Sequence, residues 1–190
     1  MSMGGYLAPR TAAFDERIDG VVAFDVCFDV GAIASRLVPQ IAFWFDRHGL
    51  GSLLSAIVRI KSALSPGLKW SLQNGMWVMG TRSPLKTIEA LRAYTLKDVA
   101  QRIKSDVLIL AGEGDHFVPV EQVKQFENSL TQARSVTSVV YDRQSGGAEH
   151  CQLGAVTLWH ATFFDWMMQK FPPTRLSRDR GLDNRQGETT

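Results

Sequence analysis

Residues 106–119 read DVLILAGEGDHFVP, and this stretch decides the fold. The apolar run DVLILA at 106–111 is typical of a strand that is buried on both faces of a sheet. Gly112 and Gly114 end this run, and residues 118–130 (VPVEQVKQFENSL) then have helical periodicity. A strand, a loop and a helix in this order predict one α/β unit.

Two more strands and two flanking helices extend the predicted core. Residues 21–28 (VVAFDVCF) are a short apolar run whose strand we expect to end near Asp25, and 135–141 (SVTSVVY) is a third strand candidate. Helices are expected over 3–14 and 155–171. The apolar stripe of the last helix comprises Val156, Trp159, Phe163, Trp166 or Met167, and Phe171. The sequence therefore predicts an α/β fold with about three mostly parallel strands.

Residues 30–102 have a different character. Long apolar stretches alternate with glycines and prolines, which predicts several short helices. The clearest is 84–94 (PLKTIEALRAY), with Ser83 as its N-cap. The tryptophans that we expect in the core of this helical block are Trp44, Trp70 and Trp77.

Composition restricts the class of protein. The chain has 190 residues, 45% of them apolar and 21% charged, which excludes a disordered, collagen-like or disulfide-rich protein. A net charge of +2 with scattered Lys and Arg argues against nucleic acid and membranes as partners, and no apolar stretch reaches the ~20 residues of a membrane span. Cys27 and Cys151 are interpreted as small buried hydrophobes, and a cytoplasmic location is expected.

Three loops carry polar side chains where a strand ends or should end. Residues 2–5 (SMGG) match the back half of a G-x-S-x-G nucleophile elbow, a tight turn that projects a serine oxygen. Asp115 follows the second strand, with Glu113 beside it as a rival acid, and His150 follows the third strand. The order Ser2, Asp115, His150 is that of a hydrolase triad.

These residue types supply the parts of nucleophilic catalysis. A serine hydroxyl is too weak an acid to attack a carbonyl alone, so His150 is the expected general base for Ser2. Asp115 is expected to hold the imidazole in the useful tautomer and to stabilise its cation. The backbone N–H of Met3 is the expected oxyanion donor, because it lies at the start of a helix. The expected partner is a small-molecule substrate, and no cofactor is expected.

Other interpretations of the polar residues stay open. Asp25 and Asp29 follow the first strand, at a position that some hydrolases use for a further acid, although we expect them to bind backbone or solvent. If Met1 is removed, the amine of Ser2 is an alternative base. The residues that suggest a metal site lack the tight spacing of zinc motifs, so no metal is expected; they are Asp115, His116, Glu149, His150 and Cys151.

The stretches 2–22 (SMGGYLAPRTAAFDERIDGVV), 107–119 (VLILAGEGDHFVP) and 146–154 (GGAEHCQLG) resemble the α/β-hydrolase superfamily. The resemblance covers about residues 2–171 and is closest to the group of 2,6-dihydropseudooxynicotine hydrolase and the fungal polyketide-shortening hydrolases of pigment pathways. It implies a serine hydrolase that cleaves ester or carbon-carbon bonds beside a carbonyl, without a cofactor and often as a homodimer. It also implies a helical lid inserted into the core.

The resemblance implies that the chain is the C-terminal part of the hydrolase fold. Residues 1–29 would form the elbow helix and first strand, 30–102 the lid, 103–171 the core strands with the acid and histidine loops, and 172–190 a disordered tail. About five strands precede the elbow in the family, and a loop among them supplies the second oxyanion donor. Losing such a donor costs about 3–4 kcal/mol. We therefore expect an open edge along strand 21–26, and the alternative function is a catalytically impaired remnant or pseudoenzyme.

Overall fold

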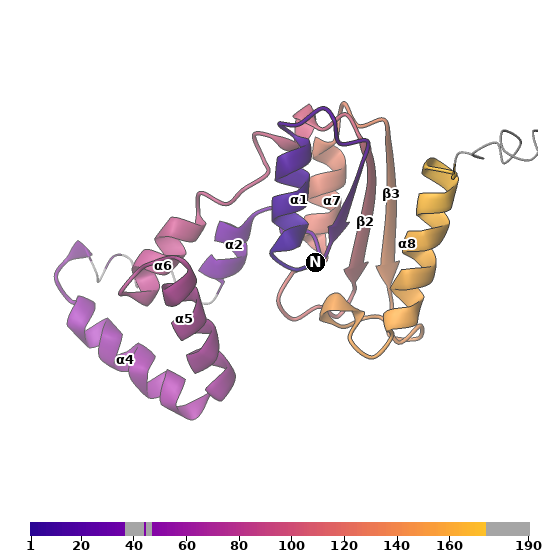
Figure 1. The fold of residues 1–190 in the computed structure, drawn as a ribbon. Helices are drawn as coiled ribbons and strands as arrows, with labels where there is room; N and C mark the ends of the chain where they lie inside the picture. Colours follow the sequence, from indigo (N-terminus) through magenta and orange to yellow (C-terminus); the bar gives the residue numbers. More distant parts are fainter. Residues whose placement is uncertain (37–43, 45–46, 174–190) are drawn as a thin grey trace, which may run out of the picture.

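The computed structural model describes residues 1–36, 44 and 47–173 (Figure 1). Its centre is a parallel sheet in the order β1 (Gly20–Phe24), β2 (Asp106–Gly112) and β3 (Ser135–Tyr141). In the sheet register, Gly20 pairs with Asp106 and Asp106 pairs with Ser135, so the three strands begin at one level. Their carboxyl ends consequently lie at one edge, and the prediction of an α/β fold is confirmed.

The sheet has a helical layer on each face. Helices α1 (Gly4–Ala12) and α7 (Glu121–Ser129) cover one face, and α8 (Val156–Lys170) covers the other (Figure 1). Side chains of β2 alternate between the two cores, with Ile109 in the first and Leu108 in the second. Burial of such an aliphatic side chain stabilises the fold by about 1.5–3 kcal/mol. This two-sided burial explains the unbroken apolar run of β2.

The remaining helices lie between β1 and β2 in the sequence and project to one side of the sheet (Figure 1). Helix α6 packs on α2 through a small apolar cluster of Ala34, Leu85 and Ile88. No helix in the described part of the chain combines the length and hydropathy that a bilayer crossing requires. The elements outside the sheet layers are α2 (Val30–Ser35), α4 (Gly51–Leu64), α5 (Pro66–Val78), α6 (Pro84–Leu91) and the 3-10 turns η1 (Ala100–Arg102) and η2 (His150–Gln152).

The expectation that the tryptophans of this helical block form its core is wrong. Trp44, Trp70 and Trp77 are 50%, 65% and 82% exposed, and α5 has no buried residue. Helix α5 packs against α4 and α6, and this thin layer leaves the outward side chains uncovered. Ser83 stands at the N-cap of α6, but its hydroxyl makes no capping hydrogen bond.

The ends of several elements differ from the sequence prediction. Helix α7 begins at Glu121 and not at residue 118. Val156 at the start of α8 is exposed, whereas Leu158 and Trp159 of the same turn pack against the sheet. Among the described residues, strand β1 pairs with β2 alone. The expected tail at 172–190 lies, from residue 174 on, outside the described residues, and the domain boundaries stay a prediction.

Helix α1 lies unusually close to the end of β1. A Cβ atom added at Gly5 would lie 2.6 Å from the carbonyl oxygens of Phe24 and Asp25, whereas one added at Gly4 would meet nothing within 4 Å. Glycine at position 5 therefore permits the contact between helix and strand that places the start of α1 at the carboxyl edge of the sheet.

We expect Gly5→Ala to lower the free energy of unfolding by about 1–3 kcal/mol, since the backbone of α1 or β1 must move. Gly4→Ala is the matched control in the same helical turn, and it should be neutral or stabilising by up to about 1 kcal/mol. Urea denaturation followed by circular dichroism measures both. Equal stability of the two variants would contradict the proposed close contact.

Candidate active site

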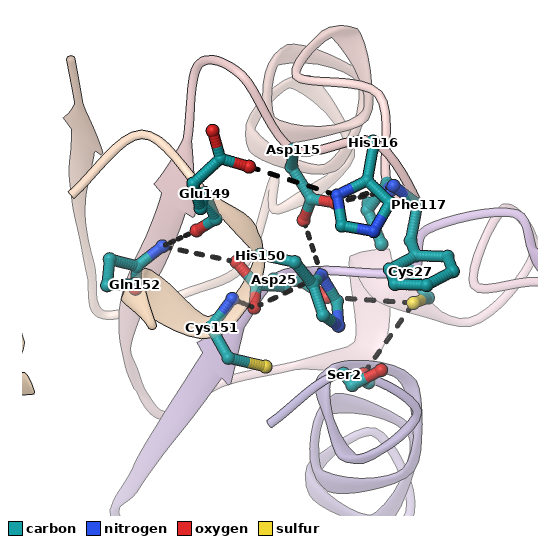
Figure 2. A network of polar contacts seen from close by, with 11 residues as sticks. Ser2, Asp25, Cys27, Asp115, His116, Phe117, Glu149, His150, Cys151 and Gln152 are labelled. Atoms are coloured by element: carbon teal, nitrogen blue, oxygen red, sulfur yellow. Dashed lines mark hydrogen bonds and ion pairs between the residues drawn. The ribbon is translucent and has the colours of Figure 1, made fainter. Parts of the chain in front are cut away.

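Polar side chains from four separate segments meet at the carboxyl edge of the sheet (Figure 2). Ser2 precedes α1, Asp25 follows β1, Asp115 follows β2, and His150 lies after β3 in the short turn η2. Parallel strands that begin at one level end at one edge, so residues separated by more than a hundred positions become neighbours. The sheet register thus assembles the site.

The shortest polar contact between side chains of this site joins Asp115 and His150. Nδ1 of His150 lies 2.7 Å from Oδ2 of Asp115, and both side chains are nearly buried. The second carboxylate oxygen, Oδ1, accepts hydrogen bonds from the backbone N–H groups of Phe117 and Val118, at 2.7 and 2.9 Å. This turn fixes the carboxylate, which in turn fixes the orientation of the imidazole.

The pKa values of this pair move apart. The hydrogen bond that the His150 ring donates to Asp115 raises the pKa of His150, against the opposing effect of burial. Burial alone would raise the pKa of Asp115, but the hydrogen bonds from His150 and from the backbone of Val118 and Phe117 hold it below its usual value. The arrangement therefore favours an imidazolium beside a carboxylate, which is the charge distribution that a general base needs after it has taken a proton.

Ser2 lies at the same edge, in a strained backbone conformation. Its φ of 53° is in the left-handed region, and its carbonyl oxygen accepts a hydrogen bond from Sγ of Cys27 at 3.6 Å. In Figure 2, the ring edge of His150 that is turned away from Asp115 points toward Ser2. The structure gives no hydrogen bond between the Ser2 hydroxyl and His150. Such contacts are often long in structures without substrate.

Met3 presents its backbone N–H at the start of α1. The N–H groups of Gly4 and Gly5 donate to the carbonyls of Met1 and Ser2, at 2.9 and 2.6 Å, but the structure gives no acceptor for the N–H of Met3. An unpaired amide at a helix N-terminus carries partial positive charge. It is therefore available to an anionic oxygen.

Asp25 is a component of the site that the sequence prediction kept only as a possible further acid, with binding to backbone or solvent preferred. Its side chain is 0% exposed, Oδ2 accepts the backbone N–H of Cys151 at 2.8 Å, and Oδ2 lies 3.6 Å from Nδ1 of His150. Burial raises the pKa of Asp25. The signal available in the sequence was its place at the end of a strand. Asp29, by contrast, caps α2 through Ala32 and pairs with Lys97 at 2.6 Å, away from His150.

Glu113 does not contact the imidazole. Its Oε1 accepts the backbone N–H of Arg143 at 2.9 Å, so among the two acids of this loop only Asp115 reaches His150. The ring of Phe117 is 52% exposed and lies 5.0 Å from the His150 ring, and exposed His116 pairs with Glu149 at 3.9 Å. An apolar ring and an ion pair thus border the imidazole.

One group of possible metal ligands occurs among the described residues. Atoms of Asp25, His150 and Cys151 lie within 4.8 Å of one another. However, the carboxylate already accepts the Cys151 N–H, and burial raises the pKa of the Cys151 thiol to about 12, which disfavours the thiolate that binds metals. Cys27 is buried with a similarly raised pKa of about 12, and both cysteines are free.

The chain is similar in sequence to fungal hydrolases, although no protein-family model matches it. It is 25% identical over 175 residues to hydrolase acrC of Aspergillus aculeatus and 27% identical over 180 residues to hydrolase LUC6 of a Fusarium species. Each match covers 90% of this chain, and 41% and 42% of the respective relative. The chain thus spans about two fifths of the length of these curated relatives.

Solved structures show the same fold. A 2,6-dihydroxy-pseudo-oxynicotine hydrolase matches with a TM-score of 0.60 at 18% identity, over 87% of this chain and 37% of that chain. The α/β hydrolase GrgF from Penicillium sp. sh18 matches with a TM-score of 0.55 at 16% identity, over 87% of this chain and 60% of that chain. The chain therefore has the fold of the C-terminal part of α/β hydrolases, and its sequence is similar to that of fungal hydrolases.

Proposed function

We propose that the chain carries the Ser-His-Asp residues of a hydrolase that acts on a carbonyl-containing small molecule. Ser2 is the nucleophile, His150 the general base and Asp115 the orienting acid. The observation that carries this proposal is the 2.7 Å contact between His150 Nδ1 and Asp115 Oδ2, at the edge where Ser2 occupies a left-handed turn. An acid, an imidazole and a strained serine in this order are the parts of the nucleophile-elbow device.

The reaction follows from the protonation states of these groups. Neutral His150 takes the hydroxyl proton of Ser2 on Nε2 while the serine oxygen attacks the carbonyl carbon. Asp115 stabilises the imidazolium that forms, and the imidazolium then gives the proton to the departing group. Water, activated by the same imidazole, releases the acyl group from Ser2. The unpaired N–H of Met3 stabilises the oxyanion in both halves of the reaction.

The substrate class is inferred from the surroundings of the site and from the relatives. The exposed ring of Phe117 beside His150 favours an apolar group next to the scissile bond. The relatives are hydrolases, and the 2,6-dihydroxy-pseudo-oxynicotine hydrolase is named for a small organic substrate. We infer cleavage of an ester or a carbon-carbon bond beside a carbonyl, with the helical block at 30–102 as a lid. A catalytically impaired remnant is the alternative.

A fluorophosphonate probe distinguishes these functions, because it bonds to an activated serine oxygen with loss of fluoride. We expect labelling of Ser2, found by mass spectrometry of the modified peptide, and none in Ser2→Ala. His150→Ala should slow labelling by about 10²- to 10⁴-fold. Ser129→Ala, a hydroxyl on α7 that bonds only to the Gln125 carbonyl, is the control and should label normally.

Three other results would change the conclusion. A folded wild-type protein that takes up no probe would favour the remnant. Labelling at another residue would exclude Ser2 as the nucleophile. Labelling that survives in His150→Ala but is lost on N-acetylation would indicate that the amine of Ser2 is the base.

The pH dependence of labelling follows from the raised pKa of His150. Only the neutral imidazole accepts a proton, so the rate should increase with pH and reach half its maximum above the ordinary histidine value of 6.5. In Asp115→Asn the hydrogen bond to a charged acceptor is lost, so the pKa of His150 and the midpoint should both fall. Histidine ring signals in NMR titrations measure this pKa directly, assigned with the His150→Ala spectrum.

Glu113→Gln is the matched control for Asp115→Asn. It removes a carboxylate from the same loop, but that carboxylate contacts Arg143 and not the imidazole. Its titration should overlay that of the wild type. An identical His150 pKa in Asp115→Asn and in the wild type would exclude Asp115 as the orienting acid.

A further inference from the structure

We propose that Asp25 is a positioning residue of the site, which holds the histidine turn η2 from the interior of the protein. The inference rests on the proposed function, in which His150 is the base. Asp25 acts on the backbone and side chain that follow His150, whereas Asp115 acts on the imidazole itself. The two carboxylates therefore have separate tasks.

The contacts of Asp25 are specific to this turn. Oδ2 accepts the N–H of Cys151 at 2.8 Å, and Oδ1 accepts the side-chain amide of Gln152 at 3.4 Å. These partners are 126 and 127 residues away in the sequence. The carboxyl and Gln152 are both 0% exposed, so water cannot replace either contact. Figure 2 shows Asp25 behind the His150 ring, between Cys151 and Cys27.

The turn needs such support because its backbone is strained. Cys151 and Gln152 have φ values of 56° and 45°, so two consecutive residues with side chains adopt the left-handed conformation. In addition, Oε1 of Gln152 is buried without a hydrogen-bond partner. An isolated loop would relax from this arrangement. The carboxylate oxygens of Asp25 hold the Cys151 amide and the Gln152 side chain in place. They thereby fix the position of His150, which directly precedes these two residues.

Asp115 and Asp25 lie at different distances from the imidazole of His150, and this difference distinguishes their roles. Nδ1 of His150 is 2.7 Å from Oδ2 of Asp115 but 3.6 Å from Oδ2 of Asp25, beyond hydrogen-bond length. Asp25 therefore does not compete for the Nδ1 proton. The charge of Asp25 still acts on the imidazole ring through space. Besides His150, the titratable groups that interact with Asp25 are Asp115, Cys27 and Cys151.

Two substitutions separate the contacts of Asp25 from its charge. Asp25→Asn keeps an oxygen that can accept the Cys151 N–H, and Asp25→Ala removes every acceptor. Asp29→Asn is the matched control, since Asp29 lies four residues later, is nearly buried, and caps α2 without touching His150. Asparagine caps helices as well as aspartate does.

We expect fluorophosphonate labelling of Ser2 to slow about tenfold or more in Asp25→Ala, with partial rescue in Asp25→Asn and no change in Asp29→Asn. The pKa of His150, followed by NMR, should fall in both Asp25 variants because a nearby negative charge is removed. A purely structural role would lower the stability of Asp25→Ala without slowing the labelling of Ser2 in the folded protein. Wild-type labelling rates and an unmoved His150 pKa in Asp25→Ala would overturn the proposal.

A measurement on the wild-type protein covers the case in which both variants fail to fold. The Cys151 amide should exchange slowly with solvent hydrogen although it lies in a turn, because it donates to the buried carboxylate of Asp25. Rapid exchange of this amide would overturn the proposal. The exchange and the His150 titration need no catalytic activity, so they test Asp25 even if Ser2 is not labelled and the proposed function fails.

Discussion

The parallel register of β1, β2 and β3 is the constraint on which the site depends. Because Gly20, Asp106 and Ser135 are level in the sheet, the loops that follow the strands emerge at one edge. Helix α1 reaches the same edge because Gly5 lies against the carbonyls of Phe24 and Asp25. In α/β folds, ligands bind outside the carboxyl ends of the strands, and here Asp25, Asp115 and His150 all follow strands at that edge.

The sequence was sufficient for the parts of the fold that depend on local patterns. The third strand was predicted at 135–141 and has these bounds, and β2 differs from its prediction by one residue, because each is an apolar run between clear breaks. The exposed faces of α4 and α5 were not predictable, since periodicity shows that a face is apolar but not what covers it. Trp77, 82% exposed, shows the difference.

In the site, too, local sequence patterns are predictable, whereas contacts between distant segments are not. Spacing, order and resemblance favoured Asp115 and His150 but left Glu113 as a rival acid. The turn that orients Asp115 toward the imidazole decides between the two acids. The contact of Asp25 with Cys151 spans 126 residues and involves a backbone N–H, which no side-chain pattern records. The indication available in the sequence was the place of Asp25 after the first strand, which left it as a possible further acid.

Two acids beside one imidazole also determine which nucleophile the site can use. Burial, with the charge of Asp25 added to it, raises the pKa of both Cys27 and Cys151 to about 12, so these thiols stay protonated at neutral pH. The same negative charges raise the pKa of His150. The environment thus suppresses thiolate chemistry while it strengthens the imidazole as a base, and a neutral hydroxyl such as that of Ser2 benefits from a stronger base.

In the described part of the chain, the non-glycine residues with positive φ are Ser2, Asp25, Cys151 and Gln152, and all four lie at the carboxyl edge of the sheet. Backbone strain of this kind persists only where surrounding contacts over-determine the conformation, and here the two buried faces of the sheet supply those contacts. The stable core and the strained edge are therefore two consequences of the same three strands.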